Sequence, residues 1–356
     1  MKYYLVGGAV RDKLLNLPFS EKDYVVIGET NESMLEKGFI SVGKKFPVYL
    51  HPKTKEEYAL ARKEKKVSSG HKGFIFETNN SVSLEEDLFR RDLTINAIAQ
   101  DENGNLVDPY EGQKDLKNKI LKHVSPAFSE DPLRIFRVAR FATRFFPLGF
   151  KIDDTTMNIM KAIPKSEIED LSFERIWQET EKILSMSHSH IFFETLEKVN
   201  ALFVFPEIEK NILNSIDSLK KLSGKSHSEE EKWAALNLEN FNQKTLPIPK
   251  KFARFENYSR DFRSTLDKEI SAKSLLEAFM KINAFRNQKL SIQVIDFLQK
   301  NNKLNSSLLS LNLEWDILLS ELNSVSPSES SSQNGELVKK EIYNARIDII
   351  KNYLNE

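Results

Sequence analysis

The pattern of apolar and polar positions predicts a strand-rich segment at the beginning of the chain. Residues 3–6 form a short apolar run that is typical of a buried strand, and two glycines separate it from a helical pattern that begins at Ala9. Residues 19–27 are predicted to form a second strand. Two later segments, bounded by polar turn residues, have the same strand-like character: residues 46–50 and residues 57–61.

Helical spacing of apolar residues dominates the chain after about residue 150. Ser172 is well suited to cap the beginning of one of these helices. A serine-rich stretch at residues 324–335 is typical of a linker between helices. The clearest predicted helices are residues 153–162, residues 172–184 and residues 191–199.

The first predicted elements carry candidate chemistry. Gly7 and Gly8 stand between a strand and a helix, where glycine backbone and free helix N–H groups can approach a phosphate. Glu21 and Asp23 are two positions apart on the second strand, so both carboxylates project from one face and can bind Mg²⁺. A Gly-Gly pair alone is more often a tight turn, and an acidic pair alone is more often a solvated strand edge. Their combination favours a site for Mg²⁺ and a nucleoside triphosphate.

Composition narrows the classes of protein to consider. The chain has 356 residues, of which 40% are apolar, and this is enough for about two to four domains with cores of their own. We find no run of about eighteen apolar residues and no signal-peptide pattern, so we expect no membrane helix. The absence of cysteine excludes disulfides and Cys-based zinc sites. A cytoplasmic protein is expected.

The charge is balanced overall but locally uneven. The formal net charge of zero argues against wholesale electrostatic adhesion to nucleic acid. Residues 113–151, however, contain nine Lys or Arg and three acidic residues. A solvated helix face is the commoner explanation for such a charge run. Residues 62–73 are also basic and contain Ser and Gly, which predicts an exposed loop.

Residues 129–144 predict a helix with two unlike faces. Ser129 suits the N-cap position, and acidic residues and Pro132 occupy the first turn. Four arginines recur at intervals of three, three and four, so they share one face of the helix while apolar residues take the other. Arginines in such an apolar setting require anionic partners. The four are Arg134, Arg137, Arg140 and Arg144.

Three motifs together resemble a known family. They are GGAVRD at residues 7–12, RRDLTINA at residues 90–97 and EDPLRIFRVARF at residues 130–141. The chain resembles the bacterial class II CCA-adding tRNA nucleotidyltransferases, which belong to the polymerase-β-type nucleotidyltransferases together with bacterial poly(A) polymerases. The likeness is nearly continuous over residues 1–208 and thin beyond. It implies an α+β fold, in which a polymerase-β-like head with a mixed sheet precedes an all-α neck, body and tail.

The resemblance also implies four domains. Longer members of the family carry an HD-type phosphohydrolase domain in the body, but residues 231–240 here contain no His-Asp pair. We therefore expect no phosphatase or phosphodiesterase activity. The expected domains are a catalytic head at 1–112, a helical neck with base recognition at 113–200, a shortened helical body at 201–245, and a helical, tRNA-binding tail at 246–356.

In the head, the resemblance assigns residues to the metal and to the incoming nucleotide. Glu21 and Asp23 correspond to the acids that hold Mg²⁺, and Gly8, Arg11 and Arg91 correspond to residues that bind the nucleotide. The family normally has Asp at both acidic positions, and Glu21 departs from this pattern while remaining an oxygen ligand.

A third acid and a base-reading set complete the implied site. Glu57 matches a third carboxylate that can accept the proton of the primer 3′-hydroxyl, although its position fits an edge-strand Glu equally well. Asp131 and Arg134 match the pair that hydrogen-bonds the Watson–Crick edge of the base. Such a pair suits C and A, which both carry an exocyclic amine there. Two further arginines would contact the nucleotide: Arg137 and Arg140.

The implied activity is Mg²⁺-dependent addition of C, C and A to the 3′ end of tRNA from CTP and ATP, with release of pyrophosphate. The implied partners are the 3′ end and acceptor arm of tRNA and the two nucleotides, without a membrane. Three alternatives stay open: a poly(A) polymerase, an enzyme that adds only CC or only A, and a tRNA-binding module in which Glu21 has abolished metal binding. A plain helical scaffold is an alternative for the residues after about 210.

Overall fold

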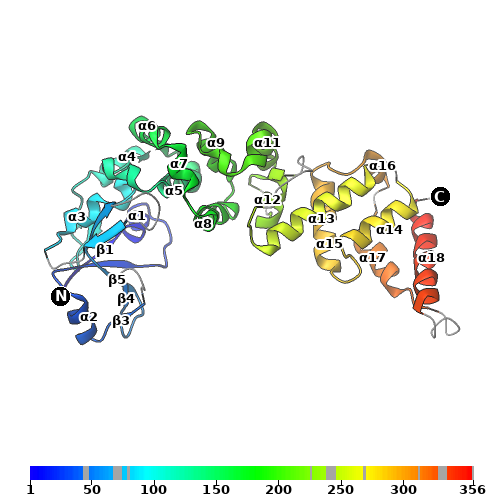
Figure 1. Cartoon of the computed structure of the whole chain (residues 1–356), viewed down its shortest axis with the longest axis horizontal. Coiled ribbons are helices and arrows are strands. Elements are labelled where there is room, and N and C mark those ends of the chain that lie inside the picture. The colour runs from blue at the N-terminus through cyan, green and yellow to red at the C-terminus, as the bar shows by residue number, and fades with distance from the viewer. Residues whose placement is uncertain are drawn as a thin grey trace. The chain divides into compact units, whose positions relative to one another are not determined.

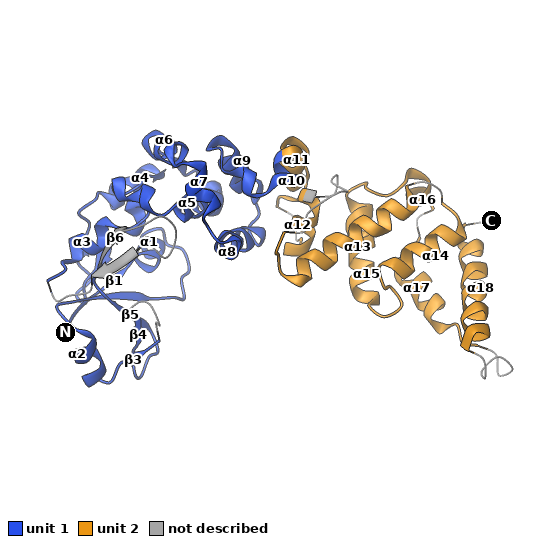
Figure 2. Ribbon diagram, in the orientation of Figure 1, with its two compact units in different colours: residues 1–209 blue, residues 210–356 orange. Residues whose placement is uncertain are grey.

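The computed structural model divides the chain into two compact units. They are Met1–Glu209 and Lys210–Glu356, coloured separately in Figure 2. Within the described residues, no helix has the length and apolar character needed to cross a bilayer. The structure describes residues 1–42, 48–66, 74–77, 81–224, 227–237, 246–267, 270–311, 313–327 and 335–354.

The first unit is built on a mixed sheet (Figure 1). Its described strands run in the order β3-β4-β5-β2-β1-β8-β9, with β2 and β5 parallel and the other neighbours antiparallel. This arrangement, followed by helices, confirms the predicted α+β fold. The strands are β1 (Lys2–Val6), β2 (Asp23–Ile27), β3 (Ile40–Ser41), β4 (Val48–Leu50), β5 (Glu57–Leu60), β8 (Ala99–Gln100) and β9 (Leu106–Val107).

Both faces of the sheet are packed, because adjacent strand residues point to opposite sides. Val25 belongs to the apolar cluster on one face, together with Leu88 of α3 (Leu84–Phe89). Val26 belongs to the cluster on the other face, together with Met34 of α2 (Asn31–Glu36). With β2 fixed in this way between two packed layers, its first residue is held at the edge of the core.

A second strand pair replaces part of a predicted loop. The basic segment 62–73 was expected to be an exposed loop, but β6 (Lys63–Lys66) pairs antiparallel with β7 (Phe74–Glu77). The physical reason is the partner, since Phe74, Ile75 and Phe76 are residues with high strand propensity. Residues 67–73 of the expected loop lie outside the described residues.

Helices complete the first unit. The apolar side of α5 is buried as its periodicity predicts, with Ile135, Val138 and Phe145 fully enclosed, and α5 packs against α8 and α9. Besides α2 and α3, its α-helices are α1 (Gly8–Leu14), α4 (Gly112–Asn118), α5 (Leu133–Phe145), α6 (Asp154–Ala162), α7 (Lys165–Glu169), α8 (Phe173–Leu184), α9 (His190–Lys198) and α10 (Pro206–Lys210). The short strands β10 (Ile120–Leu121) and β11 (Lys151–Ile152) pair in parallel.

The second unit is helical throughout its described residues. Its core includes an aromatic cluster in which the Trp315 ring meets the rings of Phe262 and Phe279 edge-on, each at 6.3 Å between centroids. The predicted domain boundaries at 112, 200 and 245 stay predictions. The helices are α11 (Ile212–Leu222), α12 (Glu229–Asn237), α13 (Lys250–Leu266), α14 (Ala272–Lys281), α15 (Gln288–Lys300), α16 (Ser306–Ser310), α17 (Trp315–Ser324) and α18 (Gly335–Leu354).

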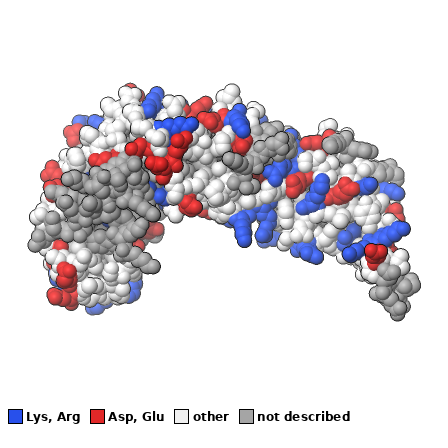
Figure 3. All heavy atoms as spheres, in the orientation of Figure 1, with Lys and Arg blue, Asp and Glu red and all other residues white. Residues whose placement is uncertain are grey.

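Surface charge is intermixed on the face drawn in Figure 3, where basic and acidic side chains lie among one another. This agrees with the zero net charge of the whole chain. Any strong local field must therefore come from a particular site rather than from the composition of the protein.

Candidate active site

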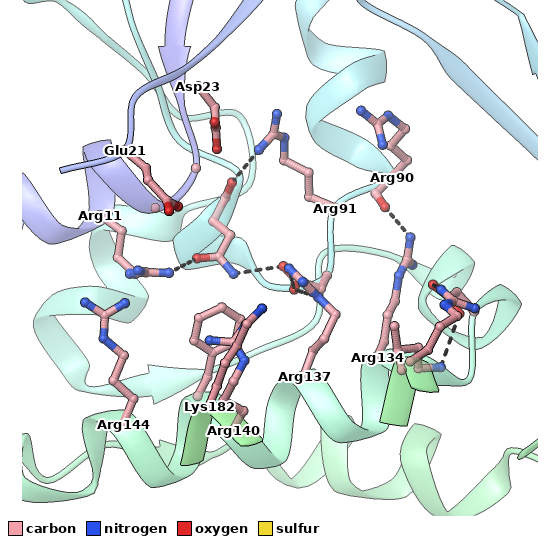
Figure 4. A pocket seen from close by; sticks show the side chains of 18 of the residues that line it. Arg11, Glu21, Asp23, Arg90, Arg91, Arg134, Arg137, Arg140, Arg144 and Lys182 are labelled. Atoms are coloured by element: carbon pink, nitrogen blue, oxygen red, sulfur yellow. Dashed lines mark hydrogen bonds and ion pairs between the residues drawn. The ribbon is translucent and has the colours of Figure 1, made fainter. Parts of the chain in front are cut away.

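A cavity of about 660 Å³ in the first unit brings the predicted site residues together (Figure 4). Gly8, Arg11, Glu21, Asp23 and Arg91 line it, and so do all four predicted arginines of α5 and Asp131. The lining is strongly cationic, with ten basic and four acidic side chains, in a protein without net charge. The basic residues are Arg11, Arg62, Arg90, Arg91, Arg134, Arg137, Arg140, Arg144, Arg175 and Lys182, and the acidic ones are Glu21, Asp23, Asp92 and Asp131.

The junction of β1 and α1 requires glycine. Gly7 has φ of +69°, a conformation that side chains disfavour, and a Cβ atom there would lie 2.9 Å from Nη1 of Arg91. Gly8 begins α1, and a Cβ atom on it would lie 3.5 Å from Nη2 of Arg11. The contact at Gly8 is an ordinary one, whereas Gly7 is required by its backbone conformation and by the close approach of Arg91. Both residues place backbone beside arginine side chains at the cavity wall, which suits an anionic ligand.

Glu21 and Asp23 supply negative charge at one end of this cationic cavity (Figure 4). The strand predicted at residues 19–27 begins only at Asp23, so the placement of Glu21 on this strand was wrong, and Glu21 lies in the segment before β2. Burial raises the pKa of Asp23 above its usual value; the Arg91 guanidinium opposes this effect, and the Glu21 carboxylate adds to it. Two neighbouring carboxylates, one of them with a raised pKa, fit a divalent cation, whose charge would relieve their repulsion.

Glu57 lies beside this pair but outside the cavity lining. It is the register partner of Asp23 in the parallel pairing of β2 and β5, so the two side chains leave the same face of the sheet. No three His, Asp or Glu side chains of the described part of the chain are grouped closely enough to hold a metal ion by themselves.

Acidic residues of three other segments hold the arginines of α5. Nη2 of Arg137 lies 2.7 Å from Oδ2 of Asp92, and Nη2 of Arg144 lies 2.9 Å from Oδ2 of Asp12 in α1. Arg140 pairs with Glu179 of α8. These partners are the anions that the prediction required for such arginines. They also keep the four arginines of α5, the arginine row, directed along the cavity wall.

The predicted base-reading pair is present at the cavity, with partners that the sequence did not indicate. Nη1 of Arg134 donates to the carbonyl of Ala127 at 2.7 Å, and its Nη2 donates to the carbonyl of Arg90. Asp131 accepts from Arg175 of α8 at 3.3 Å. Arg134 is thus anchored to backbone carbonyls. Asp131 accepts hydrogen bonds both from the backbone N–H at the beginning of α5 and from Arg175.

Several lining residues were given no role at the sequence level, among them Asn96, Arg175 and Lys182. Arg175 and Lys182 are seven residues apart on a correctly predicted helix, and this spacing places both on one face. That signal was present in the sequence. What the sequence lacks is the information that this face of α8 lies against the arginine row.

The mixed sheet, the acid pair and the arginine-lined cavity define a nucleotidyltransferase. The family described as "Poly A polymerase head domain" matches residues 3–122, and the one described as "Probable RNA and SrmB- binding site of polymerase A" matches residues 149–212. The chain is 45% identical, over 91% of its length and 78% of the relative, to the CCA-adding enzyme of Alteromonas mediterranea. The chain belongs to the family of CCA-adding enzymes, as the three motifs predicted.

Other comparisons agree with this family. A multifunctional CCA protein of Acinetobacter baumannii is 59% identical over 59% of this chain, which spans about half (51%) of that relative's length. Among solved structures, the CCA-adding enzyme of Thermotoga maritima complexed with tRNA_CCA has a TM-score of 0.67 at 18% identity, covering 99% of this chain and 90% of that one. At this identity the structural likeness supports the fold, and the residue assignments depend on the cavity itself.

Proposed function

We propose that the protein adds C, C and A to the 3′ end of tRNA, using CTP and ATP in a Mg²⁺-dependent reaction that releases pyrophosphate, and that it does so in the cytoplasm. The observation that carries this proposal is the convergence of Glu21, Asp23, Gly8 and the arginine row on one cavity in a chain of the CCA-adding family. A cationic cavity with two acids at one end is what a nucleoside triphosphate and a divalent cation require together.

The nucleotide would be held by charge and by backbone. Arg11 and Arg91 flank the glycine junction, where they can neutralise the triphosphate beside Gly8. Glu21 and Asp23 would hold Mg²⁺, which when bound polarises phosphoryl oxygens and stabilises the charge on the pyrophosphate leaving group. Glu57, on the strand beside Asp23, would accept the proton of the tRNA 3′-hydroxyl as it attacks the α-phosphate.

Base selection would depend on the beginning of α5. The Asp131 carboxylate can accept from the exocyclic amine of C or A, and Arg134 can donate to ring nitrogens or carbonyls. The contact between Arg175 and Asp131 would fix the direction of the carboxylate. U and G lack that amine at the Watson–Crick position and present a carbonyl there, so Asp131 would repel them.

The experiment that tests this proposal uses a tRNA transcript without its last three nucleotides. The purified protein is incubated with it, Mg²⁺ and CTP alone, ATP alone or both, and the products are resolved on a gel and sequenced. We expect two additions with CTP, a third when ATP is also present, and none with UTP or GTP.

Other products would support the alternatives. A long A tract would indicate a poly(A) polymerase, and additions that end at CC, or that require CC to be present, would indicate a partial enzyme. No incorporation by either the wild type or the Glu21→Asp variant, with tRNA binding retained, would overturn the catalytic proposal in favour of a binding module.

A further inference from the structure

Asn96 occupies a central place in the cavity wall that the proposed reaction does not explain. It ends a short 3₁₀ turn (Thr94–Asn96), is 6% exposed and lines the cavity. Its Oδ1 accepts from Nη1 of Arg11 at 2.6 Å, and its Nδ2 donates to Oδ1 of Asp92 at 2.8 Å. One end of a single neutral amide therefore meets a cation while the other end meets an anion.

These contacts extend to α5 in both directions. Beyond Asp92 lies Arg137, with Nη2 2.7 Å from Oδ2, and beyond Arg11 lies Asp12, which is 2.9 Å from Nη2 of Arg144. Arg137 and Arg144 are two turns apart on α5, so the series begins and ends on the same helix. We name this series the arginine circuit: Arg137, Asp92, Asn96, Arg11, Asp12 and Arg144.

Asn96 is the neutral link of the arginine circuit, and its chemistry is specific. Only the amide orientation observed directs oxygen to the arginine and nitrogen to the carboxylate. Asp at this position would set two carboxylates against each other, whereas an apolar residue would leave Arg11 and Asp92 without these bonds in a buried setting. The apolar change would release both ends of the circuit, and the change to Asp would release the end at Asp92.

The consequence for a ligand concerns Arg11. Its guanidinium lies 5.1 Å from the ring centroids of both Phe141 and Phe145, and burial lowers its pKa while Asp12 opposes this effect. Nε of Arg11 donates to Oδ1 of Asp12 at 2.8 Å and Nη1 donates to Oδ1 of Asn96 at 2.6 Å, so two different side chains fix the guanidinium beside the rings. A charged group confined in this way loses little further entropy when it binds an anion.

We propose that Asn96 is a positioning residue that joins Arg11, beside the Gly7–Gly8 junction, to the arginines of α5. The affinity for the nucleotide then depends on Asn96. This inference rests on the proposed function in that the ligand is a nucleoside triphosphate. Loss of Asn96 would let Arg11 and Arg137 move independently, which weakens nucleotide binding more than it weakens tRNA binding.

The test measures steady-state incorporation of CTP by two single variants of the full chain. Asn96→Leu removes both side-chain bonds and keeps the number of side-chain heavy atoms, and Asn96→Asp keeps the acceptor for Arg11 but loses the donor to Asp92. We expect each to raise the KM for CTP about tenfold or more, as the loss of a hydrogen bond to a charged group would, while the KM for tRNA stays within about twofold.

A matched control lies on the same unit. Asn105 donates from Nδ2 to Oδ2 of Asp101 at 2.9 Å, also across four positions, but this pair is exposed and is not part of the cavity lining. Asn105→Asp makes the same chemical change there and should leave both KM values as they are. Thermal melting of each variant separates loss of fold from loss of positioning, and Asn96→Asp carries the comparison if Asn96→Leu does not melt cooperatively.

A purely structural Asn96 would give different results. Because Asn96 acts through Arg11, Asn96→Leu should change the KM for CTP far less in an Arg11→Leu background than in the wild type. The inference is overturned if the single variants leave the KM for CTP unchanged. It is also overturned if Asn96→Leu raises this KM by the same factor in the wild type and in the Arg11→Leu background. If the wild type incorporates no nucleotide, the proposed function fails. The equilibrium Kd for CTP, compared between wild type and variants, then tests the role of Asn96. If the wild type does not bind CTP at all, both the proposed function and the inference about Asn96 are overturned.

Discussion

Asp23 and Glu57 are register partners on the neighbouring parallel strands β2 and β5, and their side chains leave the same face of the sheet. Thirty-four positions of sequence separate them, and the strand pairing alone brings them together. This relationship supports the proposal that Glu57 acts beside the acid pair, which sequence position by itself left undecided.

Replacement of Glu57 tests that proposal. Glu57→Gln keeps the size of the side chain but removes its ability to accept a proton, so kcat for CTP incorporation should fall about 100-fold, as for the loss of a general base. The control is Glu56→Gln at the preceding residue, which pairs with Lys22 at 3.1 Å instead and should retain activity. Equal rates for the two variants would show that Glu57 takes no part in the reaction.

The acid pair should be far more sensitive to loss of charge than to a change of length. Asp23→Asn and Glu21→Gln each remove an ionised oxygen ligand, and single-turnover incorporation should fall about 100-fold or more in both. Glu21→Asp retains a carboxylate and should keep activity within about tenfold of wild type. A rate for Glu21→Gln as high as that of Glu21→Asp would exclude Glu21 as a ligand.

Asp92 gives a prediction about stability and pH. Burial by itself would raise the pKa of Asp92, but the charge of Arg137, with hydrogen bonds from Asn96 and Arg137, holds this pKa well below its usual value. The ionised carboxylate therefore stabilises the fold above the unfolded-state pKa of about 3.9, and this contribution is lost as the pH falls toward the folded-state value.

Urea unfolding of wild type and Asp92→Asn measures this contribution. Removing one partner of a buried ion pair should lower the free energy of unfolding by about 3 kcal/mol at pH 7. The difference should be nearly constant down to about pH 5 and should narrow below about pH 4. A difference that stays constant down to pH 3 would contradict the account.

Asp131 should govern which nucleotide is accepted. Asp131→Ala removes the acceptor for an exocyclic amine, and discrimination of CTP against UTP, measured as a ratio of kcat/KM values, should fall about tenfold. Glu130→Gln changes the neighbouring acid, which is not part of the cavity lining, and should leave the ratio as it is. Unchanged discrimination in Asp131→Ala would remove Asp131 from base selection.

Sequence reasoning succeeded where local signals were strong. The strand before Gly7, the glycine junction and the arginine spacing on α5 each have a pattern with one main structural solution, and the residues they predicted line one cavity. It was less successful where the structure of a segment depends on contacts with residues far away in the sequence. The loop predicted at residues 62–73 includes β6, which pairs with β7. Arg175 was correctly predicted to lie on a helix, but the sequence did not indicate its contact with Asp131.

Asn96 shows the same limit within a strong motif. It lies in the RRDLTINA motif between Ile95 and Ala97, which are both buried, and the motif by itself gave Asn96 no role. Its contacts with Arg11 and Asp92 come from residues 85 positions and four positions away, respectively. Only the folded arrangement of α1, this turn and α5 gives the side chain its place in the arginine circuit.

The most direct test of the central claim is a crystal structure of the protein with CTP and Mg²⁺. The account predicts Mg²⁺ between Glu21 and Asp23, the triphosphate beside Gly8 and Arg11, and the cytosine edge facing Asp131 and Arg134. CTP bound in the cavity with Glu21 and Asp23 turned away from each other and from the metal would contradict it.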